Sequence, residues 1–203
     1  MSDSISSASL TPPDGTQRRR QGRVTALLIL AICAAPTIAA LVAYYFWHPA
    51  GRMNYGELIE PGPLPPMALV RLDGRPFALA ELKGKWVMVQ LDDAWCEAAC
   101  QKKLFNMRQV RLAQGRDMER IERVWLLPDN GMLSAELGRL TDGVLLARAQ
   151  GATGVPFPAA TNVRDYIYLV DPLGNLMLRF PKDADPRRMI KDLQRLLKVS
   201  RIG

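Results

Sequence analysis

A long uncharged hydrophobic run near the N-terminus is the clearest pattern in the chain. Residues 24–47 span 24 positions without a charged side chain, and about 20 apolar residues suffice to cross the hydrocarbon core of a bilayer. The run ends in an aromatic cluster, Tyr44-Tyr45-Phe46-Trp47, of the kind that settles at a membrane–water interface. This pattern predicts one transmembrane helix over residues 24–47.

A cleaved signal peptide is the alternative interpretation of the same run. Its apolar region would be only about 7–15 residues long and would end in a small-residue cleavage site. Here the hydrophobic run continues past its alanines into Leu41, Val42 and the aromatic cluster. We therefore expect an uncleaved anchor. A kink is expected at Pro36, which a membrane helix tolerates because neighbouring groups satisfy the freed backbone.

Beyond this run, a proline-rich linker leads into a region of alternating strands and helices. The segment 55–66 (YGELIEPGPLPP) holds four prolines and two glycines, so we expect residues 48–66 to form an extended linker. The next residues predict a hairpin that turns at Asp73-Gly74. Apolar runs bounded by turn residues predict strands at 86–91, 123–127, 166–170 and 176–180. Amphipathic spacing predicts helices at 96–114, 134–145 and 186–199.

The order of these elements defines the expected fold. Strands that alternate with helices indicate βαβ units, and the last two strands form a second hairpin. The order β–α–β–α–β–β–α behind a leading hairpin is the thioredoxin arrangement. We therefore predict an α/β protein with a thioredoxin-like fold and a leading β-hairpin over residues 67–203, preceded by one transmembrane helix.

The distribution of charge predicts how the chain is oriented. The formal net charge is +7, and four arginines lie between positions 18 and 23, just before the hydrophobic run. Cytoplasmic flanks are enriched in Lys and Arg, so residues 1–23 are expected to be a cytoplasmic tail and residues 48–203 to lie across the membrane. The expected location is a bacterial inner membrane, crossed once, with the C-terminal domain in the periplasm. No basic stripe with interleaved aromatics indicates a nucleic-acid partner.

Two cysteines, Cys96 and Cys100, fall where the first buried strand gives way to a helix. Residues four apart are neighbours on a helix face, about 5–6 Å between Cβ atoms. A disulfide requires α-carbons about 4.4–6.8 Å apart, so the pair can close with little movement. A helix N-terminus favours the thiolate. We therefore expect Cys96 to be the more exposed, attacking cysteine and Cys100 to be its resolving partner.

Acidic neighbours and burial leave other interpretations of this pair open. Asp92, Asp93 and Glu97 oppose ionisation of Cys96, because nearby negative charge disfavours a thiolate. Free cysteine also buries well, so two unrelated helix cysteines are the alternative. Their common position at one strand–helix junction, in an oxidising compartment, favours a redox pair.

The chain at this point resembles the Sco/SenC family, thioredoxin-fold proteins that help to assemble the copper centre of cytochrome c oxidase. The resemblance runs from about Leu69 to Leu197, and the C-x-x-x-C spacing is its most specific signal. The segments that carry it are LDGRPF at 72–77, LKGK at 82–85, CEAAC at 96–100 and YLVDPLGN at 168–175.

The copper site that the resemblance implies is only partly matched. The family binds copper through both cysteines and a histidine, which would fall at or near Val163, but the local sequence TNVRD contains none. The chain's one histidine is His48, at the membrane edge. The proline that thioredoxins carry beside the active site is not clearly placed, since Pro156 comes early. Two thiolates alone still hold Cu(I), because soft ligands select it.

The favoured function is therefore thiol–disulfide exchange by a membrane-tethered, extracytoplasmic protein in the assembly of the oxidase copper centre. Exchange needs only Cys96 and Cys100 and requires no cofactor. The first alternative is a Cu(I) chaperone with both cysteines as metal ligands, and the second is a degenerate thioredoxin-fold scaffold. The resemblance implies a cytochrome c oxidase subunit or another copper-handling protein as the partner, besides the membrane.

The expected orientation is testable with fusions after Gly203. A reporter enzyme that is active only outside the cytoplasm should be active there, because the arginine-rich flank holds the N-terminus inside. The matched fusion carries a reporter that is active only in the cytoplasm, and enzyme activity is compared in intact cells. Activity of the cytoplasmic reporter alone would overturn the orientation.

Overall fold

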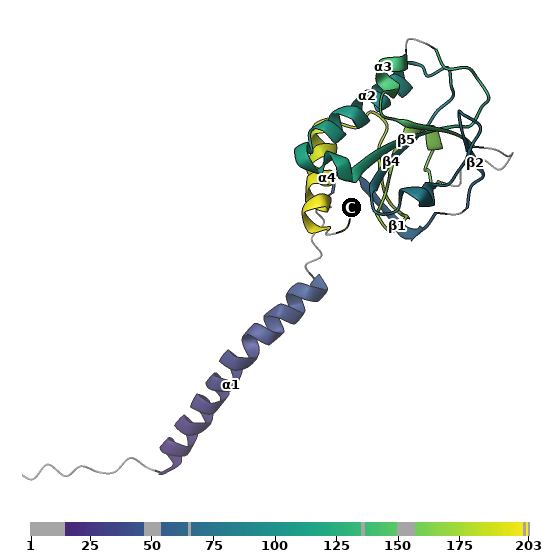
Figure 1. The fold of residues 1–203 in the computed structure, drawn as a ribbon. Helices are drawn as coiled ribbons and strands as arrows, with labels where there is room; N and C mark the ends of the chain where they lie inside the picture. Colours follow the sequence, from purple (N-terminus) through teal and green to yellow (C-terminus); the bar gives the residue numbers. More distant parts are fainter. Residues whose placement is uncertain are drawn as a thin grey trace, which may run out of the picture. The chain divides into compact units, whose positions relative to one another are not determined.

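The computed structural model describes residues 15–46, 54–64, 66–134, 137–149, 157–200 and 202. The chain divides into two compact units, Met1–Arg52 and Met53–Gly203. A long helix makes up the described part of the first unit, and a sheet with helices makes up the second (Figure 1).

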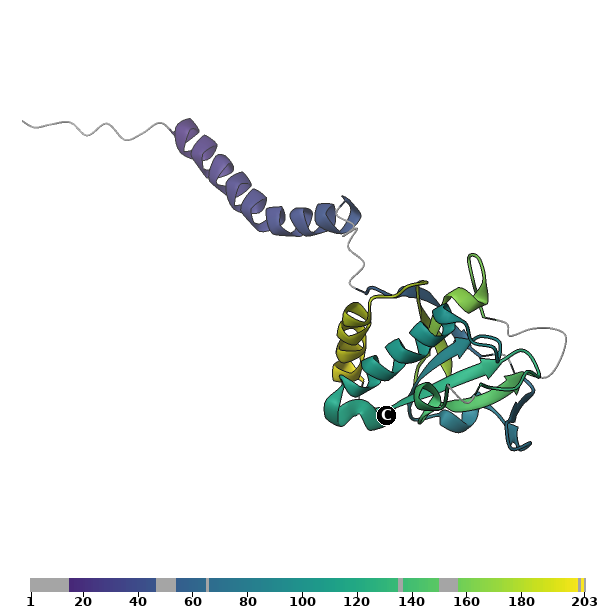
Figure 2. The same ribbon diagram turned by 90° about the horizontal axis from the view of Figure 1, so that it is seen from above.

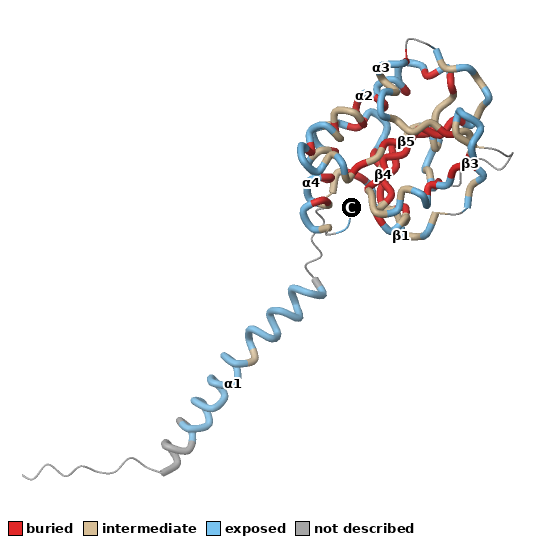
Figure 3. Tube along the Cα trace, in the orientation of Figure 1, coloured by how far each residue is buried: buried red, intermediate tan, exposed pale blue. Residues whose placement is uncertain are grey.

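The helix of the first unit, α1 (Gly15–Phe46), contains Pro36. Its stretch Gly22–Tyr45 is 24 residues long, is apolar enough to cross a membrane, and is not buried by other parts of the chain. Figure 3 shows α1 exposed along nearly its whole coloured length. The helix begins before the predicted span of 24–47, and Trp47 lies outside the described residues. By length and composition, α1 fits the single membrane span that the sequence predicts.

The second unit is built on a mixed sheet. Within its described residues, eight strands form one sheet in the order β1-β8-β7-β4-β5-β6-β2-β3. The central strands β4, β5 and β6 run parallel, whereas β7 is antiparallel to β4, and β8 is antiparallel to β7. The strands are β1 (Glu57–Pro63), β2 (Leu69–Arg71), β3 (Pro76–Phe77), β4 (Trp86–Leu91), β5 (Ile121–Leu127), β6 (Leu145–Ala149), β7 (Ile167–Val170) and β8 (Asn175–Phe180).

Two long helices, α2 (Ala98–Leu112) and α4 (Pro186–Val199), pack against one face of the sheet and lie side by side (Figure 1, Figure 2). Met88 of β4 packs there with residues of both helices. Val89, the next residue, packs on the other face, where η1 (Leu79–Leu82) contributes to the core. Strand β4 is therefore buried on both faces, as its sequence WVMVQL predicts.

The leading hairpin is present, but its turn differs from the predicted one. Gly74 N donates to Arg71 O at 2.9 Å, and Arg71 N donates to Arg75 O at 2.8 Å. The loop thus has three residues, 72–74, and Gly74 takes the left-handed position with a φ of 83°. This is a type I turn followed by a bulge, so the predicted two-residue turn at Asp73-Gly74 is wrong.

The predicted helix over 134–145 is also wrong. Within the described residues of this segment, α3 covers only Gly138–Thr141, and Leu145 begins strand β6 beside β5. Gly143, with a φ of 65°, provides the left-handed residue that commonly ends a helical turn. The apolar spacing suited a helix, but periodicity does not separate a short apolar run in a strand from one in a helix.

Part of the segment predicted as an extended linker, 48–66, forms strand β1. This strand pairs with β8 at the edge of the sheet, although it contains Pro61 and Pro63. Proline lacks a backbone donor, and an edge strand tolerates it because one side of the strand needs no partner. The prolines therefore marked an edge strand here as well as a connection.

A buried carboxylate ties the start of the second unit to α4. Asp192 is 2% exposed, and its Oδ2 atom accepts hydrogen bonds from Tyr55 N at 2.7 Å and Gly56 N at 2.9 Å. Asp192→Ala should lower the free energy of unfolding by about 1–3 kcal/mol, because it leaves buried donors unpaired. Denaturant unfolding of the detergent-solubilised chain measures this loss.

The matched control for this prediction is Asp117→Ala. Asp117 is exposed and pairs with Arg120 at 3.2 Å, so its removal should change stability by no more than about 0.5 kcal/mol. Equal losses for the two variants would contradict the role given to Asp192.

Candidate redox site

The two cysteines form a disulfide where β4 leads into α2. Their α-carbons are 5.1 Å apart, within the range predicted from their spacing. Cys100 is the third residue of α2, whereas Cys96 lies before the helix with a φ of 44°, a strained backbone position for a non-glycine residue. Cys96 N donates to Asp93 O at 3.1 Å, and Gln101 Nε2 donates to Cys96 O at 3.0 Å. These two bonds hold the strained residue in place.

Both cysteines are buried in the disulfide form. Cys96 is 2% exposed and Cys100 is 3% exposed, and both pack with Leu104, Trp125 and Leu127. The expectation that Cys96 is the more exposed of the two is therefore wrong. The physical reason is that the turn before α2 packs Cys96 into the same apolar cluster as Cys100.

Two surface hollows reach the disulfide. One hollow of about 190 Å³ is lined by both cysteines, and a second of about 240 Å³ is lined by Cys96 together with Gln101 and Leu137. Trp95 lines both hollows and is 81% exposed. Cys96 therefore lines two hollows, beside a large exposed aromatic ring.

A buried glutamine contacts the sulfur of Cys100. Gln90, in strand β4, is 0% exposed. Its Nε2 atom donates to Cys100 Sγ at 3.1 Å, to Cys100 O at 3.3 Å and to Asp92 Oδ2 at 2.7 Å. Its Oε1 atom is buried and has no hydrogen-bond partner among the groups that the structure describes. The amide therefore presents its N–H side to the sulfur.

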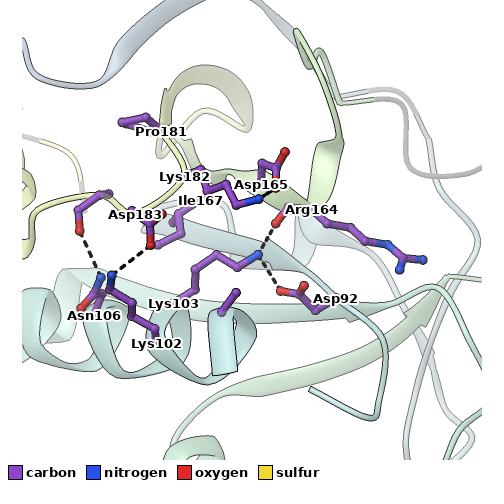
Figure 4. Close-up of a pocket in the computed structure, with 12 residues that line it drawn as sticks. Asp92, Lys102, Lys103, Asn106, Arg164, Asp165, Ile167, Pro181, Lys182 and Asp183 are labelled. Carbon is purple, nitrogen blue, oxygen red and sulfur yellow. Dashed lines mark hydrogen bonds and ion pairs between the residues drawn. The ribbon is translucent and has the colours of Figure 1, made fainter. Parts of the chain in front are cut away.

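Through Asp92, Gln90 is joined to a network of charged groups that continues away from the disulfide. Asp92 Oδ2 pairs with Lys103 Nζ at 2.7 Å, and Lys103 Nζ also donates to the backbone carbonyl of Arg164. The Arg164 side chain pairs in turn with Asp93. Figure 4 shows Lys103 extending between Asp92 and Arg164. These three residues also line a hollow of about 110 Å³. The network joins the β4–α2 connection, α2 and η4 (Val163–Asp165).

Two opposing effects act on Asp92. Burial raises the pKa of its carboxyl above the usual range, while Lys103 and the Gln90 amide act to lower it. The short contact with Lys103 indicates an ion pair, yet the net direction is upward, because desolvation of a buried pair can exceed its Coulombic gain. The ion pair thus compensates only part of the cost of burying the carboxylate.

The structure brings together both predicted site residues, Cys96 and Cys100, but their polar partners were missed. Gln90 had a usable signal, since it is the one polar residue in the buried run WVMVQL. Lys103 and Arg164 had none, because Lys103 is an ordinary helix lysine and Arg164 lies 68 positions beyond Cys96 and 64 beyond Cys100 in the sequence.

 Arg164 contacts both Asp93 and Lys103, although it is 71 and 61 positions away from them in the sequence.

The position at which the resemblance placed a copper-binding histidine is apolar. Val163 lies in η4 and packs against the hydrophobic core. His48 and Pro156 lie outside the described residues. Among the residues that the structure describes, no group of three or more His, Cys, Asp and Glu side chains is arranged to hold a metal ion. A third copper ligand beside the two cysteines is therefore not found in this part of the chain.

Comparison with known proteins shows the family to which the chain belongs. The family model described as "Transmembrane-like, thioredoxin-like, C-terminal domain" matches residues 86–200, which is more than half of the chain. The chain belongs to this family. The matched part of the thioredoxin-like domain begins at β4 and includes the disulfide, α2 and α4. No curated protein matches the sequence.

Solved structures confirm the fold of the thioredoxin-like domain. Apo Sco1 from Thermus thermophilus is 18% identical, and the match covers 72% of this chain and 99% of that chain with a TM-score of 0.52. Yeast Sco1 with copper bound is 14% identical, with 70% and 96% of the two chains covered and a TM-score of 0.55. The domain therefore has the Sco-like thioredoxin fold that the sequence predicted.

The pairing of Asp92 with Lys103 gives a testable pH dependence. Lys103→Met removes the cation but keeps a long side chain, so the pKa of Asp92 should rise further. An unfolded aspartate ionises near pH 3.9, so the folded variant loses stability as the pH rises above about 4 and Asp92 must ionise without its partner. The expected loss near pH 7 is about 1.5–3 kcal/mol, and it should be smaller near pH 4.

The neighbouring variant Lys102→Met is the control for this measurement. Lys102 pairs with Asp183 at 2.9 Å on an exposed surface, so its loss should cost less than about 1 kcal/mol. Denaturant unfolding at both pH values measures the two variants. A loss for Lys103→Met that is the same at both pH values would contradict the account of Asp92.

Proposed function

We propose that this protein is a membrane-tethered thiol–disulfide exchange protein that acts in the assembly of the copper centre of cytochrome c oxidase. Cys96 and Cys100 are the reacting residues. In the reduced form, the Cys96 thiolate attacks a disulfide of the partner and forms a mixed disulfide, and Cys100 then attacks Cys96. The partner leaves with two thiols, and the Cys96–Cys100 disulfide forms again. No cofactor takes part in this exchange.

The observation that carries the proposal is the placement of the cysteine pair. The disulfide lies at the junction of β4 and α2, with both sulfurs buried but the residues lining a common hollow. The second hollow at Cys96 supports Cys96 as the residue that meets the partner. Exposed Trp95 offers a large apolar surface beside that approach, and aromatic side chains are enriched in contacts between proteins.

The biological setting of the proposal comes from resemblance. The Sco-like fold supports a Sco-type role, and the apolar helix α1 supports tethering to a membrane. The partner is then a cytochrome c oxidase subunit or another copper-handling protein. The arginine-rich flank supports an N-terminus in the cytoplasm of a bacterial cell and a periplasmic domain.

Copper delivery is the second candidate function. One of the similar structures, yeast Sco1, is described with copper bound, and a reduced Cys96–Cys100 pair supplies two soft ligands suited to Cu(I). The described residues supply no third ligand at this site, and Val163 is apolar where the family resemblance implies histidine. Thiol exchange requires neither a third ligand nor this histidine. The cysteine pair therefore supports thiol exchange better than copper delivery.

The exchange reaction can be tested with glutathione disulfide as the probe. The reduced full chain in detergent should reduce the probe and regain its internal disulfide. Cys96→Ala should abolish the reaction, whereas Cys100→Ala should accumulate a mixed disulfide that mass spectrometry detects, because the resolving thiol is gone. Cys33→Ser, in α1, is the control and should react like the unchanged chain.

Other outcomes separate the candidate functions. No exchange by the unchanged chain, together with one tightly held Cu(I) that both cysteine variants lose, would replace exchange by delivery. Retention of cellular function by both cysteine variants would leave only a scaffold role.

A further inference from the structure

We propose that the side-chain amide of Gln90 stabilises the thiolate of Cys100 and thereby makes the Cys96–Cys100 disulfide easier to reduce. The inference deepens the proposed function, because it concerns the same disulfide, and it rests on that function for its biological purpose. It names Gln90 as a residue that touches a reacting sulfur and assigns to Cys100 the role of leaving group.

The orientation of the Gln90 amide follows from its charged neighbour. Asp92 Oδ2 lies 2.7 Å from Gln90 Nε2 and also pairs with Lys103 Nζ. An ionised carboxylate only accepts hydrogen bonds, so the amide must turn its nitrogen toward Asp92. The second N–H then points to Cys100, with Sγ at 3.1 Å and the carbonyl oxygen at 3.3 Å. Asp92 and Lys103 thus fix a donor on the sulfur of Cys100.

This donor matters more after reduction than before it. A disulfide sulfur accepts a hydrogen bond only weakly, whereas a thiolate carries a full charge, and hydrogen bonds to charged groups are roughly twice as strong. The site is also dry, since Gln90 is 0% exposed and Cys100 is 3% exposed. A hydrogen bond is electrostatically stronger in such surroundings than in water. The amide therefore favours the reduced form over the oxidised form.

The unpaired side-chain oxygen of Gln90 supports the same role. Oε1 is buried and accepts no hydrogen bond from the groups described in the disulfide form. Leaving a buried acceptor unsatisfied is unfavourable, and an apolar side chain would fill the same place in β4 without that cost. The structure thus retains a polar group whose partners are incomplete while the disulfide is closed. Gln90 contacts the reacting pair at Cys100, through its sulfur and its backbone carbonyl oxygen.

The step in which Gln90 acts is the opening of the disulfide. After exchange with the partner, a dithiol reductant reopens the disulfide: one of its thiolates attacks Cys96 Sγ, the bond between Cys96 and Cys100 breaks, and the electron pair of that bond goes to Cys100 Sγ. The second thiolate of the reductant then attacks the mixed disulfide and releases Cys96, so that the two reductant thiols are oxidised to one disulfide. Disulfides open faster when the leaving thiol is the more acidic one. The Gln90 N–H acts on that leaving sulfur.

The test compares Gln90→Met with Gln114→Met in the full chain in detergent. Methionine has a similar length and no donor. Gln114 is a matched control because it is also a buried glutamine and follows the end of α2, away from the disulfide. Its Nε2 atom donates to Val110 O at 2.9 Å. The chains are equilibrated with buffers of reduced and oxidised glutathione, quenched with acid, and alkylated so that mass spectrometry counts free thiols.

Gln90→Met should shift the equilibrium constant about tenfold toward the disulfide, which converts to a reduction potential about 30 mV more negative. Gln114→Met should leave the constant unchanged. Gln90→Glu keeps the shape of the side chain and serves if the methionine variant does not fold. Its carboxylate replaces a donor by an acceptor and should shift the constant in the same direction. No shift in the Gln90 variants, or an equal shift in Gln114→Met, would overturn the inference.

A second measurement keeps this inference separate from the proposed function. In a Cys96→Ala background, the ultraviolet absorbance of the Cys100 thiolate should be lost at a higher pH in Gln90→Met than with Gln90 present. If the unchanged chain cannot be reduced reversibly by glutathione, thiol exchange fails, and this titration still decides the role of Gln90. An unchanged titration curve would overturn that role while exchange itself stands.

Discussion

Strand β4 is buried on both faces, and this constraint shapes the candidate site. Its apolar side chains separate into those that meet the two helices, such as Met88, and those that meet the other core, such as Val89. Gln90 shares that burial, so its amide needs partners inside the protein. It finds them in Asp92 and Cys100, directly beyond the strand. The burial of β4 thereby determines which polar groups contact Cys100 at the C-terminal end of the strand.

The charged network carries this constraint away from the sulfur. Burying the Asp92 carboxylate is unfavourable, and its raised pKa reflects this cost. The ion pair with Lys103 offsets part of the cost. Lys103 is fixed in turn by the backbone of Arg164 in η4, whose side chain pairs with Asp93. Segments far apart in the sequence thus determine how one amide is oriented beside Cys100. Such contacts fix the polar groups around the Cys96–Cys100 disulfide.

The sequence predicted those features that depend on local patterns. An apolar run with clear ends predicted β4, amphipathic spacing predicted α4, and the separation of Cys96 and Cys100 predicted their bonding distance. Features that depend on distant partners were missed. Strand β6 was not predicted, and its first residue, Leu145, was assigned to the helix over 134–145, because this short apolar run takes its conformation from β5. The contacts of Lys103 were not predictable, because an amphipathic helix does not reveal which lysine will be buried against a distant backbone carbonyl.

The surroundings of the disulfide differ from those that a complete copper site requires. A Cu(I) site needs soft ligands that converge on one point, but the groups beside these sulfurs are an amide donor, carboxylates and cations. Val163 of η4 is packed against the core. The position at which the family resemblance implied a ligand therefore contributes to packing instead. Arg164 of η4 pairs with Asp93, and both residues line the hollow at the disulfide. Hydrogen-bond donors of this kind act on thiolate charge, which is the quantity that governs exchange.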